Sequence, residues 1–283
     1  MLPPMPLVDL PDRPGSENRT LFCRDAGAGS PVLLVHGWPH DRRVWDGLAD
    51  ALSDAHRVIV PDLPGFGYSP PWHAGAPTDA EPLTMDHLAD DLAGLLDAIG
   101  VEGPVTLGGV SMGGYVALAF AEAYPEDVAA LLLFDTKAAA DSDAARGKRG
   151  EIVERVLSQG VGFLAEDCPD QQLSRRTLDE REKVVEALQN MCEAATPAGV
   201  VGAQRGMAER PDRTGLCGRV KVPTLVVGGA DDTFTPPADL RALAGLFPRG
   251  TYAEVPGCGH LPPLENPEAT AEAVLAFLDA PPG

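Results

Sequence analysis

The feature that most constrains the fold is a series of short, strongly apolar runs, rich in β-branched residues, that alternate with stretches of helical periodicity. Runs this short and apolar are typical of strands buried on both faces. They occur at residues 32–35, 58–60, 105–107, 131–134, 225–227 and 251–255. Helical spacing is clearest from Met85 to Ile99, with Thr84 as the expected N-cap and Gly100 beyond the end. The alternation predicts an α/β fold with a mostly parallel central sheet flanked by helices.

The alternation stops between about residues 137 and 218, where the sequence becomes helical and charged and has no strand-like run. Thr177 and Glu180 are spaced as a capping box and indicate one helix there. We therefore expect a core domain built from residues 21–136 and 219–283, with residues 137–218 inserted as a helical cap, or lid. The alternative is an ordinary run of sheet-covering helices, which the length of the strand-free gap disfavours. The proline-rich residues 1–20 are expected to form an N-terminal tail.

Composition narrows the classes of partner. Lys and Arg number 22 against 42 Asp and Glu, so the formal net charge is −20, which disfavours binding to nucleic acid or to an anionic membrane. The five cysteines show no C-x-x-C spacing, so neither a disulfide framework nor a zinc site is expected. No signal-like segment and no apolar stretch of membrane-spanning length is recognisable. We expect a cytoplasmic protein with reduced thiols, and none of these features specifies an oligomeric state.

The segment GGVSMGG, residues 108–114, contains the candidate nucleophile. Ser111 lies between Gly109 and Gly113, directly after the apolar run at 105–107 and before a helical run that ends at Pro125. This is a G-x-S-x-G motif in the strand, turn, helix context of a nucleophile elbow. The turn holds the serine in a strained backbone conformation, and flanking residues without side chains let strand and helix approach closely.

Two further loops follow strand-like runs upstream of this motif. HGWPH begins at His36, and the Gly-rich segment DLPGFGYS begins at Asp62. Together with the serine motif, these segments resemble the α/β-hydrolase fold family, and the resemblance extends over about residues 22–278. It implies an α/β-hydrolase fold for the predicted sheet.

The resemblance also implies roles for residues in these loops. The backbone N–H groups of Trp38 and Met112 would form the oxyanion hole of a serine hydrolase. His36 is expected to brace its loop without taking a proton. Asp62 and Ser69 match the family pattern D-x-P-G-x-G-x-S, which implies a structural loop anchor and no catalytic role.

A serine hydroxyl needs a base to remove its proton. The family carries its histidine in the loop after the last strand, where this chain has His260 in GCGHLPP. For the acid, the family pattern G-x-x-D-x-x-x-P matches GGADDTFTP in the register that selects Asp232. Asp231 is the main rival. Asp135 is a third candidate, because some relatives take the acid from the strand that follows the nucleophile helix.

Longer stretches, such as SMGGYVALAFAEAYPEDV and GCGHLPPLENPE, resemble 3-oxoadipate enol-lactonases and their carboxylesterase relatives. The resemblance implies a serine hydrolase that cleaves a small ester or lactone through an acyl-enzyme, without a metal or an organic cofactor. Ser111 argues against epoxide hydrolases and haloalkane dehalogenases, which use aspartate at the elbow, and against dienelactone hydrolases, which use cysteine. C–C bond hydrolases and perhydrolases share the serine triad and stay open as alternatives. A small-molecule receptor on the same fold is an alternative of a different class.

Specificity is expected to depend on the lid and the oxyanion loop, because the triad itself contacts only the carbonyl group of the substrate. Trp38, Tyr115 and Phe134 are candidate pocket residues, with ordinary core packing as the alternative for each. Apolar lid residues such as Phe163 and Met191 are expected in the core of the lid.

Overall fold

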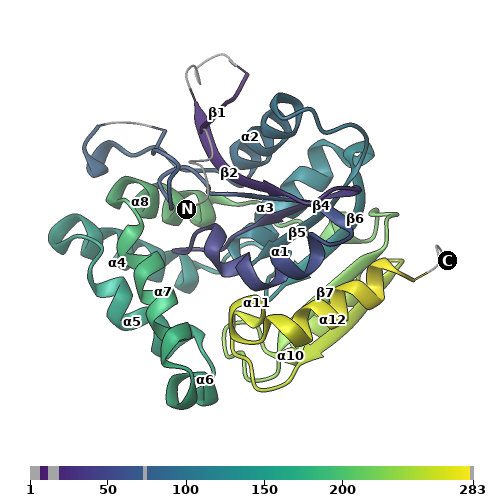
Figure 1. Ribbon diagram of the computed structural model, residues 1–283. Coiled ribbons are helices and arrows are strands. Elements are labelled where there is room, and N and C mark those ends of the chain that lie inside the picture. Colours follow the sequence, from purple (N-terminus) through teal and green to yellow (C-terminus); the bar gives the residue numbers. More distant parts are fainter. Residues whose placement is uncertain (1–6, 12–18, 73–74, 281–283) are drawn as a thin grey trace.

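The structure is a computed structural model that describes residues 7–11, 19–72 and 75–280 (Figure 1). An eight-stranded sheet with the order β1-β2-β4-β3-β5-β6-β7-β8 forms its centre. β1 pairs antiparallel with β2, and β2 with β4, whereas all pairs from β4–β3 to β7–β8 are parallel. The strands are β1 (Leu7–Asp9), β2 (Thr20–Ala26), β3 (Ser30–Val35), β4 (His56–Pro61), β5 (Val105–Val110), β6 (Val128–Phe134), β7 (Thr224–Gly229) and β8 (Gly250–Val255). The predicted α/β class with a mostly parallel sheet is confirmed.

β1 lies within the segment that the sequence analysis expects to be a tail. Leu7 pairs with Phe22 and Asp9 with Thr20, so this segment adds a short edge strand to the sheet. Residues 1–6 and 12–18 of the expected tail lie outside the described residues.

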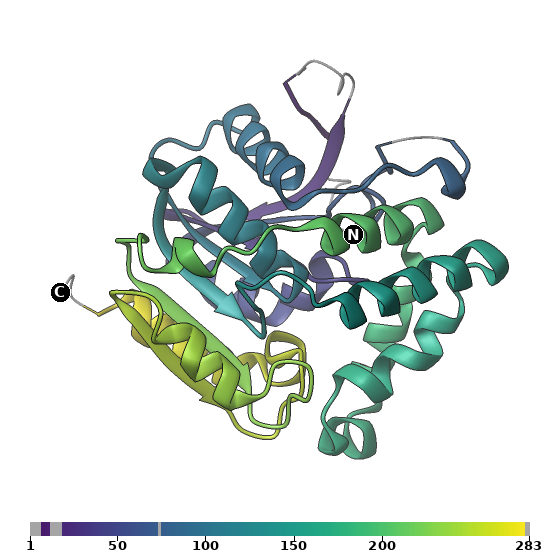
Figure 2. The same ribbon diagram turned by 180° about the vertical axis from the view of Figure 1, so that it is seen from behind.

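Helices cover both faces of the sheet. On the face seen in Figure 1, α1 (Asp46–Leu52) packs against α12 (Pro267–Leu278). Figure 2 shows the opposite face, where α2 (Met85–Ala98) packs against α3 (Met112–Ala123) and α10 (Pro237–Ala244) lies on β7 and β8. β5 and β7 are buried along their whole length, as expected for strands covered on both faces.

Short helical turns complete the connections of the core. They are η1 (Arg42–Trp45), η2 (Pro77–Asp79), η3 (Pro125–Asp127), α9 (Thr214–Cys217) and α11 (Pro262–Glu265). The Trp38–Pro39 peptide bond, in the loop that follows β3, is cis.

The segment between β6 and β7 is described throughout and contains helices but no strand. Its helices are α4 (Asp143–Gln159), α5 (Phe163–Gln172), α6 (Arg175–Glu180), α7 (Glu182–Ala194) and α8 (Pro197–Glu209), followed by α9. α4 packs against α8, and α5 packs against α7. Figure 1 shows α4 to α8 together at one side of the sheet. The division into a core and a cap, with limits at residues 137 and 218, stays a prediction.

The expected capping box within this segment is wrong. α6 begins after Ser174, whose hydroxyl accepts a hydrogen bond from the backbone N–H of Thr177 over 3.1 Å. Thr177 is therefore inside α6, and its own hydroxyl points to a buried carboxylate, that of Glu265. The apolar residues that the capping box was expected to precede belong to the next helix, α7, which begins after Arg181.

All five cysteines lie among the described residues, and all are buried and unpaired. None of the helices in the described part of the chain has both the length and the apolar character needed to cross a membrane.

Candidate active site

Ser111 lies in the sharp turn between β5 and α3. Its backbone has φ 54° and ψ −114°, a region that residues with side chains rarely occupy and that is often found at functional sites. Two contacts hold the turn: the Ser111 N–H donates to the Phe134 carbonyl over 2.9 Å, and the Thr136 hydroxyl donates to the Ser111 carbonyl over 2.7 Å.

The flanking glycines are required by close backbone contacts. A Cβ atom on Gly109 would lie 2.2 Å from the carbonyl oxygen of Gly113, and a Cβ atom on Gly113 would lie 2.1 Å from that of Val35. Any side chain would therefore push the strand and the helix apart. This is the steric reason for the G-x-S-x-G pattern.

His260 is buried in the loop between β8 and α11, and its ring is held by Asp232. Nδ1 of His260 lies 2.8 Å from Oδ2 of Asp232. The carboxylate of Asp232 also accepts hydrogen bonds from the Phe234 N–H, over 2.8 Å, and from the Thr235 hydroxyl. Burial alone would raise the pKa of Asp232, but the hydrogen bond and charge of His260, with the Thr235 and Phe234 donors, hold it well below its usual range. Asp232 therefore stays ionised beside the imidazole.

The other two candidate acids lie differently. Asp231 is exposed, and its backbone N–H donates to the Cys258 carbonyl over 2.8 Å. Asp135 is fully buried at the end of β6, has φ 41°, and accepts a hydrogen bond from the Gly229 N–H over 3.0 Å. Burial, and then the negative charge of Asp232, raise the pKa of Asp135 well above its usual value. Both effects favour the neutral form of Asp135 over its charged form.

Asp135, Asp232 and His260 are also the one group of potential metal ligands among the described residues, with ligand atoms within 4.8 Å of one another. Nδ1 of His260 is already engaged by Asp232, so a metal at this position would have to displace that hydrogen bond. The donor set fits the orientation of an imidazole better than it fits a metal ion.

A pocket of about 450 Å³ is lined by both Ser111 and His260, a volume typical of small-molecule sites. Trp38 and Tyr115, two of the three candidate pocket residues, are among its lining residues. Phe234, which the sequence analysis did not select, also lines it, and its ring lies 5.2 Å from the His260 ring. The Ser111 hydroxyl and His260 are not hydrogen-bonded in the described structure.

Phe134 lies elsewhere than expected. Its side chain is fully buried in the core and packs edge-on against Trp45, with ring centroids 5.1 Å apart. Phe134 contributes to the site through its backbone, whose carbonyl accepts the Ser111 N–H. Side chains alternate across a strand, and the register of β6 directs this one away from the pocket.

The loop after β3 carries Trp38. Among the described residues, neither the Trp38 N–H nor the Met112 N–H donates a hydrogen bond to another protein atom. Unpaired N–H groups are rare in buried backbone. Met112 follows Ser111 directly, and Gly37, the neighbour of Trp38, lies close to the Ser111 side chain. Beneath the loop, His36 is fully buried and bridges two segments, since its Nε2 accepts from the Leu63 N–H over 2.9 Å and its Nδ1 lies 2.7 Å from the Gly37 carbonyl.

The Gly-rich loop after β4 is built around the buried carboxylate of Asp62. This group accepts hydrogen bonds from the backbone N–H groups of Arg42 and Tyr68, over 2.8 and 2.9 Å. Ser69 donates to the Asp62 carbonyl over 2.6 Å and accepts from the Phe22 N–H over 2.9 Å. These contacts are those of a loop anchor, and neither Asp62 nor Ser69 is among the residues lining the Ser111 pocket.

Two residues that the sequence analysis missed connect the histidine loop to the helical segment. Gln172, at the end of α5, accepts the His260 N–H on its carbonyl over 2.7 Å, and its side-chain oxygen lies 2.6 Å from Nε2 of His40. Glu265 accepts hydrogen bonds from the N–H groups of Gly259 and Ser174, both over 2.8 Å. The signal for Glu265 in the sequence was an acidic residue in the motif LENP, shortly after His260.

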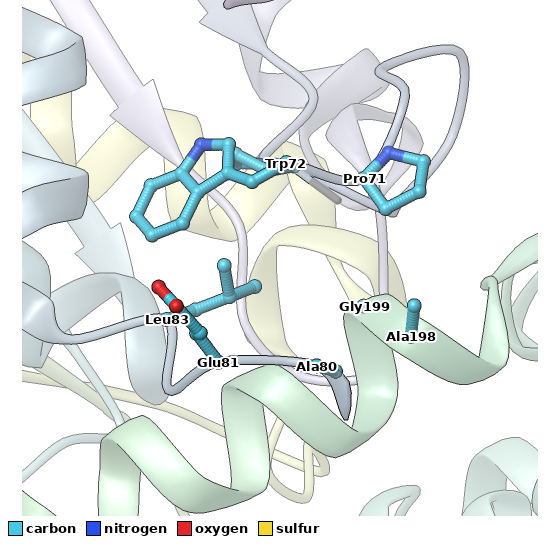
Figure 3. Close-up of a pocket in the computed structure, with 8 residues that line it drawn as sticks. Pro71, Trp72, Ala80, Glu81, Leu83, Ala198 and Gly199 are labelled. Carbon is cyan, nitrogen blue, oxygen red and sulfur yellow. The ribbon is translucent and has the colours of Figure 1, made fainter. Parts of the chain in front are cut away.

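A second hollow, shown in Figure 3, lies away from this site. Its lining includes Trp72 and Leu83, together with Ala198 and Gly199 of α8. Its volume of about 10 Å³ is enough for about one water molecule. None of the candidate catalytic residues lines it, so it does not compete with the Ser111 pocket as a substrate site.

The profile of the α/β hydrolase fold family matches residues 30–267. The chain belongs to this family. Its relatives with recorded functions include esterases and lipases, and this α/β hydrolase is an enzyme of the hydrolase class.

Solved structures and curated relatives resemble this α/β hydrolase over almost its whole length. The malate-bound structure of a thermophilic esterase from Thermogutta terrifontis is 41% identical, with a TM-score of 0.90 and coverage of 96% of this chain and 97% of that one. The enol-lactonase from Burkholderia xenovorans LB400 shares the fold at 22% identity, with a TM-score of 0.84 and coverage of 97% and 100%. The 2-hydroxy-6-oxo-6-(2'-aminophenyl)hexa-2,4-dienoic acid hydrolase of Metapseudomonas resinovorans is 29% identical over 280 residues, covering 93% of this chain and 88% of its own.

Proposed function

We propose that this enzyme hydrolyses small carboxylic esters or lactones, with Ser111 as nucleophile, His260 as general base and Asp232 as the acid that orients His260. The proposal depends chiefly on the 2.8 Å contact between Asp232 and Nδ1 of His260, because His260 lines the same pocket as Ser111. It is supported by the likeness to the Thermogutta terrifontis esterase, which is 41% identical over 96% of this chain.

The chemistry follows from the tautomer that Asp232 selects. With the proton on Nδ1 donated to Asp232, Nε2 is the free base that takes the Ser111 proton as Oγ attacks the ester carbonyl carbon. The Trp38 and Met112 N–H groups, which have no protein acceptor among the described residues, would stabilise the oxyanion. Nε2 then protonates the leaving oxygen as the C–O bond breaks.

The second half of the reaction reverses these roles. A water molecule gives its proton to Nε2 of His260 and attacks the acyl-enzyme, and Ser111 regains its proton as it leaves. With an ester the alcohol departs in the first half. With a lactone the new hydroxyl stays attached to the acyl chain, so a single hydroxy acid is released.

Labelling with a fluorophosphonate tests the nucleophile. Intact-mass spectrometry should show one adduct on the wild-type protein and none on Ser111→Ala, beside assays of p-nitrophenyl esters and small lactones. Ser111→Ala should fold normally and lose about six orders of magnitude in kcat. Retention of more than a few per cent of activity would refute the assignment.

C–C bond hydrolysis is the second candidate, because a 29% identical relative carries the name of a dienoic acid hydrolase. Assays with a vinylogous 1,5-diketone beside the esters separate the two activities. Turnover of the diketone without ester turnover would favour the second candidate. Absence of both the adduct and all turnover would favour a small-molecule receptor.

A further inference from the structure

The positive charges around the Ser111 pocket contrast with the rest of the chain. The protein has a formal net charge of −20 and only four lysines, at positions 137, 148, 183 and 221. Two of these four, Lys137 and Lys148, line the pocket that contains Ser111 and His260, together with Arg149. The single acidic residue among the described lining residues is Asp141. A protein with almost twice as many acidic as basic residues thus has a net positive pocket.

The acidic residue in the pocket is neutralised by arginines. Asp141 forms ion pairs with Arg149 and with Arg210, the latter over 2.8 Å. The hydrogen bonds from both arginines hold the pKa of Asp141 below its usual value despite partial burial. Arg149 also donates to the side-chain oxygen of Gln204 over 3.0 Å. Asp141 and Arg149 therefore neutralise each other, and each also binds a neighbouring side chain.

The two lysines form no such ion pairs within the described part of the chain. Both are exposed, and within the described part of the chain neither ammonium group has a carboxylate partner within 4.0 Å. Lys137 follows the end of β6, next to Thr136, which holds the Ser111 carbonyl. Lys148 comes from α4, on the helix face whose neighbours Ala145 and Ile152 also line the pocket. Two separate elements thus bring unpaired ammonium groups to one pocket.

We propose that Lys137 and Lys148 form an anion subsite, and that the favoured substrates are esters or lactones carrying a carboxylate away from the scissile bond. This inference rests on the hydrolase function proposed for Ser111. The acidic surface repels small anions in general, so cations at the pocket are needed to admit an anionic substrate. An exposed ammonium contributes modestly to binding, and two acting together give a preference that salt weakens.

A matched pair of esters tests the subsite. Monomethyl glutarate and methyl pentanoate have the same chain, and a carboxylate in the first replaces a methyl group in the second. Binding of both esters to Ser111→Ala protein, measured by ligand-observed NMR titration, should favour monomethyl glutarate by about tenfold at low salt. Each of Lys137→Gln and Lys148→Gln, added to Ser111→Ala, should weaken binding of the anion about threefold, and both together about tenfold. Adding 0.5 M NaCl, a value chosen to shorten the screening length to about 4 Å, should reduce the preference.

Lys183→Gln is the matched control, because it removes the same charge from an exposed position on α7 that does not line the pocket. It should leave the preference unchanged. Equal binding of the two esters, or a preference that survives the double lysine substitution, would overturn the subsite.

Hydrolysis by the wild-type enzyme separates this inference from the function on which it rests. Turnover of both esters without preference for the anion would retain the esterase and overturn the subsite. Lysine-dependent anion binding without turnover of any ester would retain the subsite as a ligand site and overturn the esterase.

Discussion

The carboxylate of Glu265 accepts a hydrogen bond from the backbone N–H of Gly259 over 2.8 Å, one residue before His260. Its other oxygen accepts from the Ser174 N–H, also over 2.8 Å, and from the Thr177 hydroxyl over 2.7 Å. Glu265 is 1% exposed, so these hydrogen bonds are shielded from water. The buried side chain of Glu265 thus connects the histidine loop to the start of α6, and the orientation of His260 depends on the helical segment as well as on Asp232.

Replacing the Glu265 side chain should disturb both stability and catalysis. In Glu265→Gln, an NH₂ group replaces one of the two oxygens that accept these hydrogen bonds. Each buried donor that loses its acceptor should cost about 1–3 kcal/mol of stability. We expect the free energy of unfolding in urea to fall by about 2–3 kcal/mol. A shifted His260 should lower kcat by about tenfold to a hundredfold. Glu268→Gln, on the exposed start of α12, is the control, and equal effects of the two substitutions would contradict the connection.

The acid can be identified by comparing two adjacent substitutions. Asp232→Asn removes the charge that holds Nδ1 of His260 and stabilises the imidazolium, so kcat should fall by about four orders of magnitude. Asp231→Asn changes an exposed carboxylate and should have little effect. Steady-state hydrolysis of one p-nitrophenyl ester measures both variants. Equal and mild losses would transfer the role of the acid to Asp135.

Asp135 should tolerate a neutral replacement. Because burial and the charge of Asp232 raise its pKa well above the usual value, an amide has the same charge and can still donate a hydrogen bond. Asparagine also tolerates the φ of 41° at this position. We expect Asp135→Asn to keep kcat within about threefold, with an unchanged acid limb in the pH profile of kcat/KM.

Asp135→Gly is the comparison, since it removes the side chain without backbone strain and leaves the Gly229 N–H without its acceptor. It should lower the free energy of unfolding by about 1–3 kcal/mol. A large shift of the acid limb in Asp135→Asn would mean that Asp135 is ionised in the working enzyme.

The buried His40 should make the protein sensitive to acid. Burial is the main cause that lowers the pKa of His40 to about 3, from an ordinary value of 6.5. As the pH falls below 6.5 the unfolded chain takes up a proton at this residue and the folded chain does not, so stability is full above pH 6.5 and is lost progressively toward pH 3. At pH 5, His40 should have lowered the free energy of unfolding by about 2 kcal/mol relative to pH 8.

Urea unfolding of the wild-type protein and His40→Gln at pH 8 and pH 5 tests this sign. The loss of stability between the two pH values should be smaller in His40→Gln by about 2 kcal/mol. The difference between the two proteins cancels the contribution of His36, whose pKa burial also lowers. An identical loss in both proteins would show that His40 is protonated in the folded state.

The parts of the fold that could be predicted are those decided by contiguous residues. The Thr84 cap of α2 is confirmed, because its hydroxyl accepts the His87 N–H only three residues along. The glycines around Ser111 were also predictable from local sequence, because strand, turn and helix meet there within a few residues. The capping box at Thr177 failed, although it is local, because Ser174 three residues earlier offers the same chemistry and has tertiary support, donating to the Gly257 carbonyl over 2.9 Å.

By itself, the sequence determined the sheet class, the turn at Ser111 and a short set of candidate acids, because periodicity and steric demands act between near neighbours. The family register pointed to Asp232, but only the tertiary structure placed its carboxylate against His260 and left Asp231 exposed. It alone decided that Phe134 belongs to the core and that Lys137 and Lys148 meet at one pocket. These outcomes depend on how distant elements pack together, and no local pattern records that.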